Sequence, residues 1–356
     1  MGQDPQPKKR VTITDVAQHA GVSTAAVSKV LRNAYGVSAA MQEKVRAAIA
    51  ELDYRPHTAA RGMRGRTYTI GVLLDNIRNA FFADILDGVH DALQDSEYTV
   101  MIGAAGFSAD AQRKTVQSMI DRQVDGLILI APSTQRTETL TTAQSTPLVI
   151  LGHHDVSDLH DSVVDADAAG AALVVDHLVS QGHRNIALVS SPGTRSSKWA
   201  RTPEIVLTNG YVEAMNRHRL ADHVRICRAA YSDEGGYKAG LSLLTGENPP
   251  TAIMTGADVA ALGVWRAAHE VGLRIPEDLS LVGYNNTALA DLATVQLTSV
   301  DQAGHDMGSS AARLLIERVE GRREHAVQTS MTPRLIVRRS TAAPGPGRAL
   351  PGSGRR

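Results

Sequence analysis

The stretch VTITDVAQHAGVSTAAVSK, Val11–Lys29, predicts two short helices joined by a tight turn. Thr12, with Asp15 three residues later, has the capping-box pattern that begins a helix. Gly21 permits the positive φ at which a helix ends sharply, and Ser23 can cap the helix that follows. These features predict a helix-turn-helix, a unit whose second helix enters the major groove of DNA.

The apolar residues of this stretch agree with that arrangement. Val16, Ala17 and Ala20 share one face of the first helix, and two valines of the second helix, Val27 and Val30, face back onto it. Ser28 and Lys29 are expected to face outward. A small helical hairpin without a DNA function is the alternative, but cap, turn, apolar face and outward cation all agree in register.

Charge is divided unevenly along the 356 residues. Residues 1–66 contain eleven Lys and Arg against five Asp and Glu, a formal charge of +6, and the remainder of the chain carries −6. A basic head on an acidic body predicts that only the head meets a polyanion.

The other features of the composition are those of an ordinary globular protein. The single cysteine, Cys227, excludes an intramolecular disulfide framework. The first ten residues lack the apolar run of a secretion signal, and no run approaches the ~18 residues of a membrane span. We therefore expect a cytoplasmic protein with no membrane partner.

The pattern of residues divides the chain into five parts. Residues 1–10 are expected to be a disordered arm, 11–55 a helix-turn-helix domain closed by a third helix over Ala39–Leu52, and 56–67 a hinge. Pro56 stops the third helix, and the hinge can form only one or two helical turns, which are unstable alone. Residues 68–340 form the core, and the Pro- and Gly-rich residues 341–356 are expected to be a disordered tail.

Apolar runs alternate with helical patterns throughout the core, which predicts an α/β fold of parallel βαβ units. The first set of runs is Thr69–Leu74, Thr99–Ala104, Gly126–Ile130 and Leu148–Leu151. The second set is Ser162–Asp165, Asn185–Ser190, Val224–Cys227, Ala252–Thr255 and Ser280–Tyr284. Two lobes are expected, lobe 1 over about 68–165 and 302–331 and lobe 2 over about 166–301 and 332–340. A ligand cleft should lie at the carboxyl ends of their strands.

Short motifs along nearly the whole chain match one known family. In the head they are Thr12-Ile13-Thr14-Asp15-Val16-Ala17, Ala20-Gly21-Val22-Ser23, Val27-Ser28-Lys29-Val30-Leu31 and Tyr54-Arg55-Pro56. In the core they are Ile70-Gly71-Val72, Asn79-Ala80-Phe81-Phe82, Gly182-His183, Ala261-Leu262-Gly263, Ile275-Pro276, Val282-Gly283-Tyr284 and Leu297-Thr298-Ser299-Val300. On these motifs the chain resembles the lac-repressor (LacI/GalR) family of bacterial transcription regulators.

The resemblance implies a homodimer that reads a palindromic operator in double-stranded DNA. Thr24, Ala25 and Lys29 occupy the positions that address base edges, and Arg61 and Met63 those of the hinge in the minor groove, with Met63 as the wedge. The full set of DNA-binding residues that we expect is Thr12, Ser23, Thr24, Ala25, Ser28, Lys29, Asn33, His57, Ala60, Arg61, Met63 and Arg64.

The resemblance also implies a core like that of periplasmic binding proteins, with a small-molecule effector, a sugar or other metabolite, between the lobes. Effector binding would change the angle between the lobes and so move the paired hinges. The effector-binding residues that we expect are Asp75, Phe81, Phe82, His153, Arg201, Tyr231, Asp258, Asn285 and Gln302. Packing is the alternative role of Phe81, Phe82 and Tyr231, and a helix N-cap that of Asp258.

Several core positions differ from those of sugar-binding relatives. Gly152 and Asn285 stand where aspartate is common, Ala257 where asparagine is common, and Leu207 where an arginine is usual. Arg195 or Arg201, in the long segment 191–209, could supply a guanidinium instead. We therefore expect a cleft with fewer carboxylates, which leaves the class of effector open.

Other functions are disfavoured by the motifs. The cluster His153-His154-Asp155, Asp158 and His160-Asp161 lacks metal-ligand spacing and is expected to be a solvated loop, so no metal site is predicted. No phosphate-binding loop or nucleophile elbow follows a strand, so neither an enzyme nor a cofactor is expected. The remaining alternative is a ligand-binding protein of the periplasmic sugar-binding type without a DNA function, against which the basic head argues.

Overall fold

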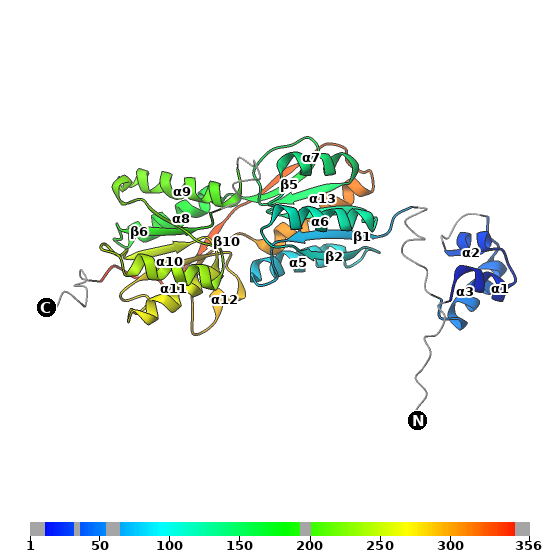
Figure 1. The fold of residues 1–356 in the computed structure, drawn as a ribbon, viewed down its shortest axis with the longest axis horizontal. Coiled ribbons are helices and arrows are strands. Elements are labelled where there is room, and N and C mark those ends of the chain that lie inside the picture. Colours follow the sequence, from blue (N-terminus) through cyan, green and yellow to red (C-terminus); the bar gives the residue numbers. More distant parts are fainter. Residues whose placement is uncertain (1–10, 32–35, 55–64, 193–200, 346–356) are drawn as a thin grey trace, which may run out of the picture. The chain divides into compact units, whose positions relative to one another are not determined.

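The computed structural model describes residues 11–31, 36–54, 65–192 and 201–345, and the chain divides into two compact units, Met1–Thr67 and Tyr68–Arg356 (Figure 1). The predicted arm, most of the predicted hinge, and residues 346–356 of the predicted tail lie outside the described residues. Within the part that is described, no helix combines the length and the apolar run that a bilayer crossing requires.

The first unit is a head of three helices around a small apolar core. The helices are α1 (Ile13–Ala20), α2 (Thr24–Leu31) and α3 (Ala39–Glu51). Thr12 and Asp15 form the expected capping box, and Gly21 ends α1 at φ +66°. Val16, Val27 and Val45 are fully buried between the three helices. The head therefore has the helix-turn-helix that the sequence predicts.

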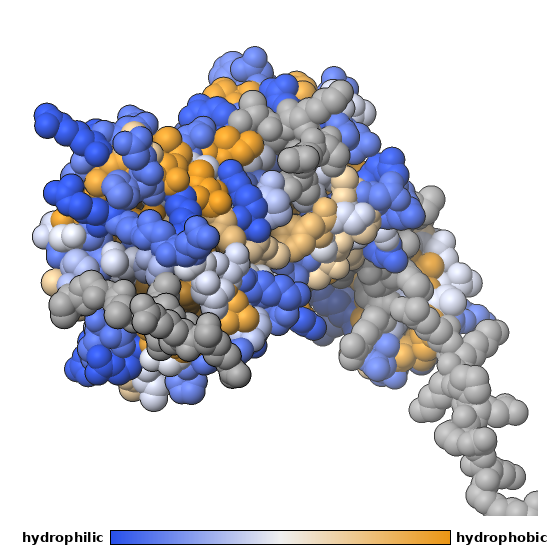
Figure 2. Space-filling model, turned by 60° about the vertical axis from the view of Figure 1, so that its left-hand side comes forward, coloured by the Kyte–Doolittle hydropathy of each residue, from blue (hydrophilic) through white to orange (hydrophobic). Residues whose placement is uncertain are grey.

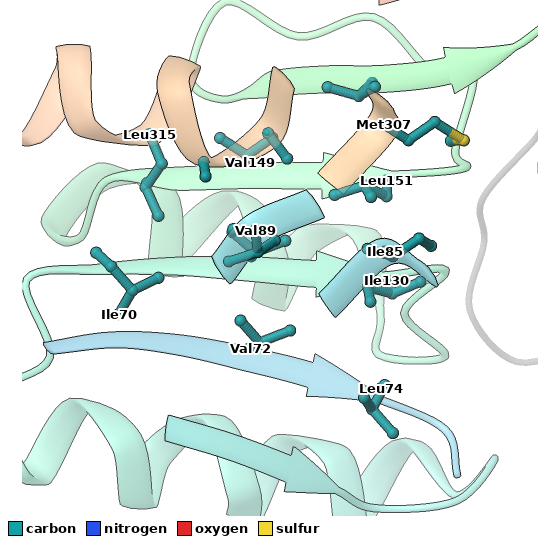
Figure 3. Close-up of a cluster of buried hydrophobic side chains, with 14 of the residues drawn as sticks. Ile70, Val72, Leu74, Ile85, Val89, Ile130, Val149, Leu151, Met307 and Leu315 are labelled. Atoms are coloured by element: carbon teal, nitrogen blue, oxygen red, sulfur yellow. The ribbon is translucent and has the colours of Figure 1, made fainter. Parts of the chain in front are cut away.

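Lobe 1 of the second unit is built on a six-stranded parallel sheet with the order β11-β5-β4-β3-β1-β2. Its strands are β1 (Thr69–Leu74), β2 (Thr99–Ala104), β3 (Gly126–Ile130), β4 (Leu148–Leu151), β5 (Asp161–Asp165) and β11 (Gln328–Met331). Helices α5 (Ala80–Leu93) and α13 (Gly304–Val319) cover one face, and α6 (Ala109–Asp121) and α7 (Arg136–Ser145) the other. In Figure 3, Val72 of β1 lies next to Val89 of α5, and Ile70, Leu74 and Ile85 belong to the same apolar cluster.

Lobe 2 repeats this plan with the strand order β12-β10-β9-β8-β6-β7. Its strands are β6 (Ile186–Ser190), β7 (Arg225–Arg228), β8 (Ala252–Thr255), β9 (Ser280–Tyr284), β10 (Thr298–Asp301) and the antiparallel β12 (Arg334–Ile336). Helices α8 (Asp167–Ser180) and α9 (Pro203–Arg217) pack on one face, and α10 (Asp233–Leu244) and α11 (Asp258–Glu270) on the other. The short η1 (Ala221–His223) and α12 (Ala288–Asp291) complete the lobe.

The chain passes between the lobes three times, from β5 to α8, from β10 to α13 and from β11 to β12. In Figure 1 the orange helix α13 accordingly lies among the cyan elements of lobe 1. The first and third passages are joined where the Ala166 N–H donates to the Met331 carbonyl at 3.1 Å. The run Ser162–Asp165, which opens the second set of predicted runs, lies in the sheet of lobe 1.

The start of the predicted tail is ordered, so the expected boundary at residue 341 is wrong. The Ala342 carbonyl lies 2.8 Å from His183 Nε2 and 3.0 Å from Ser280 Oγ, and Thr341 Oγ1 lies 2.9 Å from His177 Nε2. Burial of His183 and Ser280 demands partners for their polar atoms, and residues 341 and 342 supply them.

On the face of the molecule in Figure 2, hydrophilic residues surround scattered hydrophobic ones.

Candidate functional site

Helix α2 presents the side chains that the sequence assigns to base edges, from Thr24 in its first turn to Lys29 in its last. Thr24, Ala25 and Lys29 are exposed, and Ser23 is exposed while its Oγ accepts a hydrogen bond from the Ala26 N–H at 3.1 Å. Thr12 is also exposed at the start of α1. The head therefore offers a cation and a hydroxyl on the outer side of one helix, as direct readout of a groove requires.

Ser28 does not face outward as expected, because only 6% of its surface is exposed. Helix α2 packs against both α1 and α3, so its buried face includes Ser28 as well as Val27 and Val30. The expected DNA-binding residues Asn33, His57, Ala60, Arg61, Met63 and Arg64 lie outside the described residues.

A cavity of about 330 Å³ lies between the two lobes. It contains seven of the nine residues that the sequence assigns to the effector, namely Asp75, Phe81, Phe82, His153, Tyr231, Asn285 and Gln302. Phe81 and Phe82 come from the start of α5 in lobe 1, and Tyr231 follows β7 in lobe 2. The volume is that of a site for a small organic molecule.

Two of the expected effector residues do not line this cavity. Asp258 is the first residue of α11, and its buried carboxylate accepts hydrogen bonds from the Thr287 N–H, Thr287 Oγ1 and Ser299 Oγ. The backbone carbonyl of Arg201 accepts a hydrogen bond from the His154 N–H at 2.9 Å, and the side chain of Arg201 is exposed. The carboxylate of Asp258 therefore joins α11 to the segments of Thr287 and Ser299, and Leu207 lines the cavity.

Asp75, at the end of β1, is the first of several buried carboxyls in the cavity. Its Oδ1 accepts a hydrogen bond from Gln112 Nε2 at 2.7 Å, and Gln112 Oε1 accepts from the Ser133 N–H at 2.7 Å. Burial raises the pKa of Asp75 to about 7, and the nearby Glu204 carboxylate adds to the rise while the Gln112 bond opposes it. Asp75 therefore titrates close to neutral pH.

Two passages between the lobes and the loop after β9 carry a second polar network. Gln302 Nε2 donates to Asp165 Oδ2 at 2.8 Å, and Asn285 Nδ2 donates to Gln302 Oε1. Asn285 Oδ1 is buried and has no hydrogen-bond partner among the described residues. Asn285 has a φ of +108°, in the left-handed region that asparagine tolerates better than most residues. An amide oxygen is thus held, unsatisfied, at the wall of the cavity.

The cluster of histidines after β4 is buried, so the expected solvated loop is wrong. His153 and His160 are each 2% exposed, and Asp161 is fully buried. The Asp161 carboxylate accepts hydrogen bonds from the guanidinium groups of Arg318 and Arg323, which draws the segment against α13. His153 lines the cavity, and burial lowers its pKa to about 3, so the imidazole is neutral.

Sequence reasoning missed three carboxyls of the cavity, Asp165, Asp167 and Glu204. The cavity therefore contains four carboxyl groups, of which the sequence predicted only Asp75. Asp165 ends β5, Asp167 begins α8, and Glu204 lies in the first turn of α9. Position at the end of a predicted strand could have identified Asp165, and Asp167 two residues later, because ligands bind at the carboxyl ends of parallel strands.

Asp167 is linked to His154, whose Nε2 lies 2.8 Å from Asp167 Oδ2. Ligand atoms of His154, Asp165 and Asp167 lie within 4.8 Å of one another, an arrangement that could hold a metal ion. Hydrogen bonds within this group and to Gln302 already engage these three side chains. Burial raises the pKa of Asp165 and of Asp167, so the group holds protons at neutral pH.

Comparison with known proteins identifies both units. Residues 12–57 match the family of bacterial regulatory proteins of the lacI family, and residues 175–341 match the periplasmic binding protein-like domain. The chain is 32% identical over 336 residues to the HTH-type transcriptional repressor PurR of Klebsiella pneumoniae (strain 342), which covers 93% of this chain and 97% of the relative. PurR of Escherichia coli O139:H28 matches to the same extent.

Solved structures agree with these matches. The lac repressor dimer bound to operator and the anti-inducer ONPF has a TM-score of 0.78 and 27% identity, and the match covers 94% of this chain and 100% of that one. A complex of the transcriptional regulator CelR with cellobiose has a TM-score of 0.67 and 27% identity, covering 93% and 100%. The helix-turn-helix head, the two-lobed core and relatives matched over almost their whole length show that this chain belongs to the lacI family of bacterial transcription regulators.

Proposed function

We propose that this protein is a transcriptional repressor that binds an operator through its head and is switched by a small molecule in the cavity between its lobes. The observation that carries the proposal is the union, in one chain, of an exposed recognition helix and a two-lobed ligand cavity. The relatives named as repressors and the CelR structure with cellobiose support both halves of it.

Direct readout of bases would rest on two side chains. Lys29 can donate to guanine, Thr24 can bond to several base edges, and Ala25 offers only a methyl contact. Ser23 and Thr12, exposed at helix starts, are suited to phosphate contacts. The predicted hinge, with Arg61 and Met63 in the minor groove and Arg64 on the backbone, remains part of this proposal.

We further propose that the protein acts as a homodimer on a palindromic operator, as the lac repressor dimer does. In support, β2 forms one edge of the sheet of lobe 1, and half of the surface of Ile102 on that edge is exposed. A DNA partner places the protein in the cytoplasm, and regulation without catalysis fits the relatives, which are regulators.

Three passages between the lobes offer a physical route for the switch. Gln302 links the second passage to Asp165 of the first at the cavity wall, and Asn285 of lobe 2 bonds to Gln302, so a ligand that contacts these residues can favour one angle between the lobes. Only a ligand with different affinity for the two angles shifts the equilibrium. Release of the operator by an effector is the direction that we favour.

A gel shift with the full chain and with residues 1–66 removed tests the proposal. The full chain should bind fragments of its own promoter region at moderate salt, and the shortened chain should bind none. If the full chain bound no such fragment, it would have to be a ligand-binding protein without a DNA function.

Lys29→Ala tests the assigned readout. Loss of one bidentate base contact should reduce the discrimination between the best site and single-base variants by about 1–3 kcal/mol. Competition gel shifts against a set of variant operators measure this discrimination. Lys44→Ala, in α3, is the control cation, and a Lys29→Ala protein with unchanged preference would contradict the assignment.

A further inference from the structure

The cavity between the lobes presents hydrogen-bond acceptors from four carboxyl groups and no opposing cation among the described residues that line it. Asp75, Asp165, Asp167 and Glu204 all line it, whereas no described lysine or arginine does. We propose that the effector is an organic cation, a protonated amine or amidinium carried on an apolar or aromatic body. This inference rests on the proposed function and names the ligand class of that same site.

The four carboxyls approach the cavity from different parts of the fold. Asp75 lies at the end of β1 in lobe 1, Asp165 and Asp167 flank the first passage between the lobes, and Glu204 lies on α9 in lobe 2. Glu204 is close enough to raise the pKa of both Asp75 and Asp167 by charge repulsion. A positive group among them would replace this repulsion by attraction to several carboxylates at once.

A second, independent observation also requires a donor from the ligand. Asn285 is only 7% exposed, lines the cavity, and its Oδ1 has no partner among the described residues. Its amide nitrogen is already committed to Gln302. A buried acceptor without a hydrogen bond costs free energy, and an N–H group of the ligand would donate one to Asn285 Oδ1.

The walls of the cavity suit the body of such a ligand. Phe81, Phe82 and Tyr231 present aromatic rings from both lobes, and Leu207 adds an apolar side chain. Aromatic faces attract a desolvated cation. Burial raises the pKa of Tyr231 to about 12, so its hydroxyl stays neutral and adds no charge of its own.

The histidines near the cavity are neutral, and the described arginines near it do not line it. His153 has a pKa of about 3, and burial also lowers the pKa of His154. The Arg228 guanidinium donates to Ser190 Oγ and Thr208 Oγ1, and the side chain of Arg201 is exposed; neither residue lines the cavity. A cation entering the cavity would therefore meet no charge of its own sign among the described lining residues.

Binding of a cation should release protons. In the empty cavity burial holds Asp75, Asp165 and Asp167 partly or wholly protonated near pH 7, with Glu204, His154 and Tyr284 facing them. A bound cation lowers these pKa values, so protons leave on binding and affinity rises with pH until the empty site is itself ionised. Binding of a neutral polyol would release no comparable number of protons.

Matched trios of probes test the ligand class on the full chain. Each trio holds size constant and changes charge: tyramine, tyrosol and 4-hydroxyphenylacetate; agmatine, 1,4-butanediol and succinate; glucosamine, glucose and glucuronate. Thermal shift identifies binders, and calorimetry in buffers of different ionisation enthalpy counts the protons released. The amine of at least one trio should bind best, with proton release and a dissociation constant that falls up to about tenfold per pH unit between pH 6 and 8.

Variants separate binding in this cavity from binding elsewhere. Glu204→Gln and Asp75→Asn should each weaken the best amine about tenfold, while Asp121→Asn, an exposed carboxylate at the end of α6, should change nothing. Glu204 is only half-buried, so its variant should fold even if Asp75→Asn does not.

The proposal is overturned if no amine binds, or if a neutral or anionic member of a trio binds as tightly as its amine. The gel shift keeps this failure apart from failure of the proposed function. A neutral ligand that is weakened by Glu204→Gln and still changes operator affinity would preserve the switch and reject the cation.

Discussion

At the scale of single residues, the buried carboxylate of Asp161 joins the end of α13 to the start of β11 in lobe 1. Its carboxylate is fully buried, and Arg318 Nε and Arg323 Nη1 lie 2.9 and 2.8 Å from its oxygens. The Val327 N–H donates to the same group at 2.7 Å, just before β11. The neighbouring carboxylate raises the pKa of Arg323 further above its ordinary value. Two guanidinium groups and a strand start thus depend on one side chain.

Asp161→Asn should lower the free energy of unfolding by about 3 kcal/mol, because it removes the carboxylate that pairs with the largely buried Arg318 and leaves Arg323 with Glu317 alone. Urea denaturation of the full chain followed by circular dichroism measures the change. Asp110→Asn removes an exposed ion pair with Arg113, and it should cost less than about 1 kcal/mol. An equal loss of unfolding free energy in the two variants would show that the buried cluster around Asp161 stabilises the fold no more than an exposed ion pair does.

At this scale the sequence predicted contacts between residues that are close together in the chain, and it did not predict contacts between distant ones. The capping box of Thr12 and Asp15 was predictable because both partners lie within one helical turn. The burial of Ser28 was not, because it depends on how α2 packs against α1 and α3 together. The role of Asp258 depends on Thr287 and Ser299, which lie on other elements. Partners far apart in sequence leave no periodic signal.

At the scale of elements, close helix pairs hold each lobe together. In lobe 1, a Cβ built on Gly308 of α13 would overlap the backbone carbonyl of Ile85 in α5, and one on Gly88 would overlap that of His305. In lobe 2 the same relation joins Gly236 of α10 to Ala260 and Gly263 of α11 to Asp233. Each pair of helices therefore packs backbone against backbone, each through two reciprocal glycines.

Gly308→Ala should force α5 and α13 apart and cost about 2 kcal/mol or more, despite the better helix propensity of alanine. The loss should appear as a lower midpoint in thermal or urea unfolding. Gly246→Ala is the matched control, since its Cβ would come no closer than 3.3 Å to the Arg225 side chain. A Gly308→Ala protein as stable as the control would mean that the helices can separate at no cost.

Most elements of the core were predictable because their apolar runs are long and fully buried. The strands β10, β11 and β12 were not among the expected runs. QTSM and RLI are short and partly exposed, and TSVD of β10 is buried but mostly polar. Burial on both faces usually produces a continuous apolar run, which these three segments lack. The content of the cavity was only partly predictable, because Glu204 shares no sequence neighbourhood with the carboxyls that it faces.

At the scale of the whole molecule, buried histidines and buried carboxyls shape stability against pH in opposite ways. Burial lowers the pKa of His153, His154, His160, His177 and His183, so the unfolded chain binds more protons below about pH 6.5 and stability falls there on acidification. Burial raises the pKa of Asp75, Asp165 and Asp167, so the folded chain holds protons that the unfolded chain has lost, and stability falls as pH rises to those values.

Above about pH 7.5 the histidines of the unfolded chain have lost nearly all their protons, so the histidine contribution is complete and the carboxyls dominate. The full chain without ligand should lose on the order of 1 kcal/mol of stability between about pH 7.5 and pH 9. Urea midpoints at three pH values in this window measure the loss, and Asp167→Asn should flatten it. Stability that rises with pH across the window would contradict the assigned protonation of the cavity.

The distant origin of β11 has a consequence for the order in which the protein is made. Gln328 of β11 pairs with Ser162 of β5, so the sheet of lobe 1 cannot be completed until nearly the whole chain has left the ribosome. The helices of the head, by contrast, are all present once residue 51 has emerged. The helix-turn-helix head is therefore made early, and the core that binds the effector is completed last. A message truncated within the core would encode a head without a complete effector-binding core.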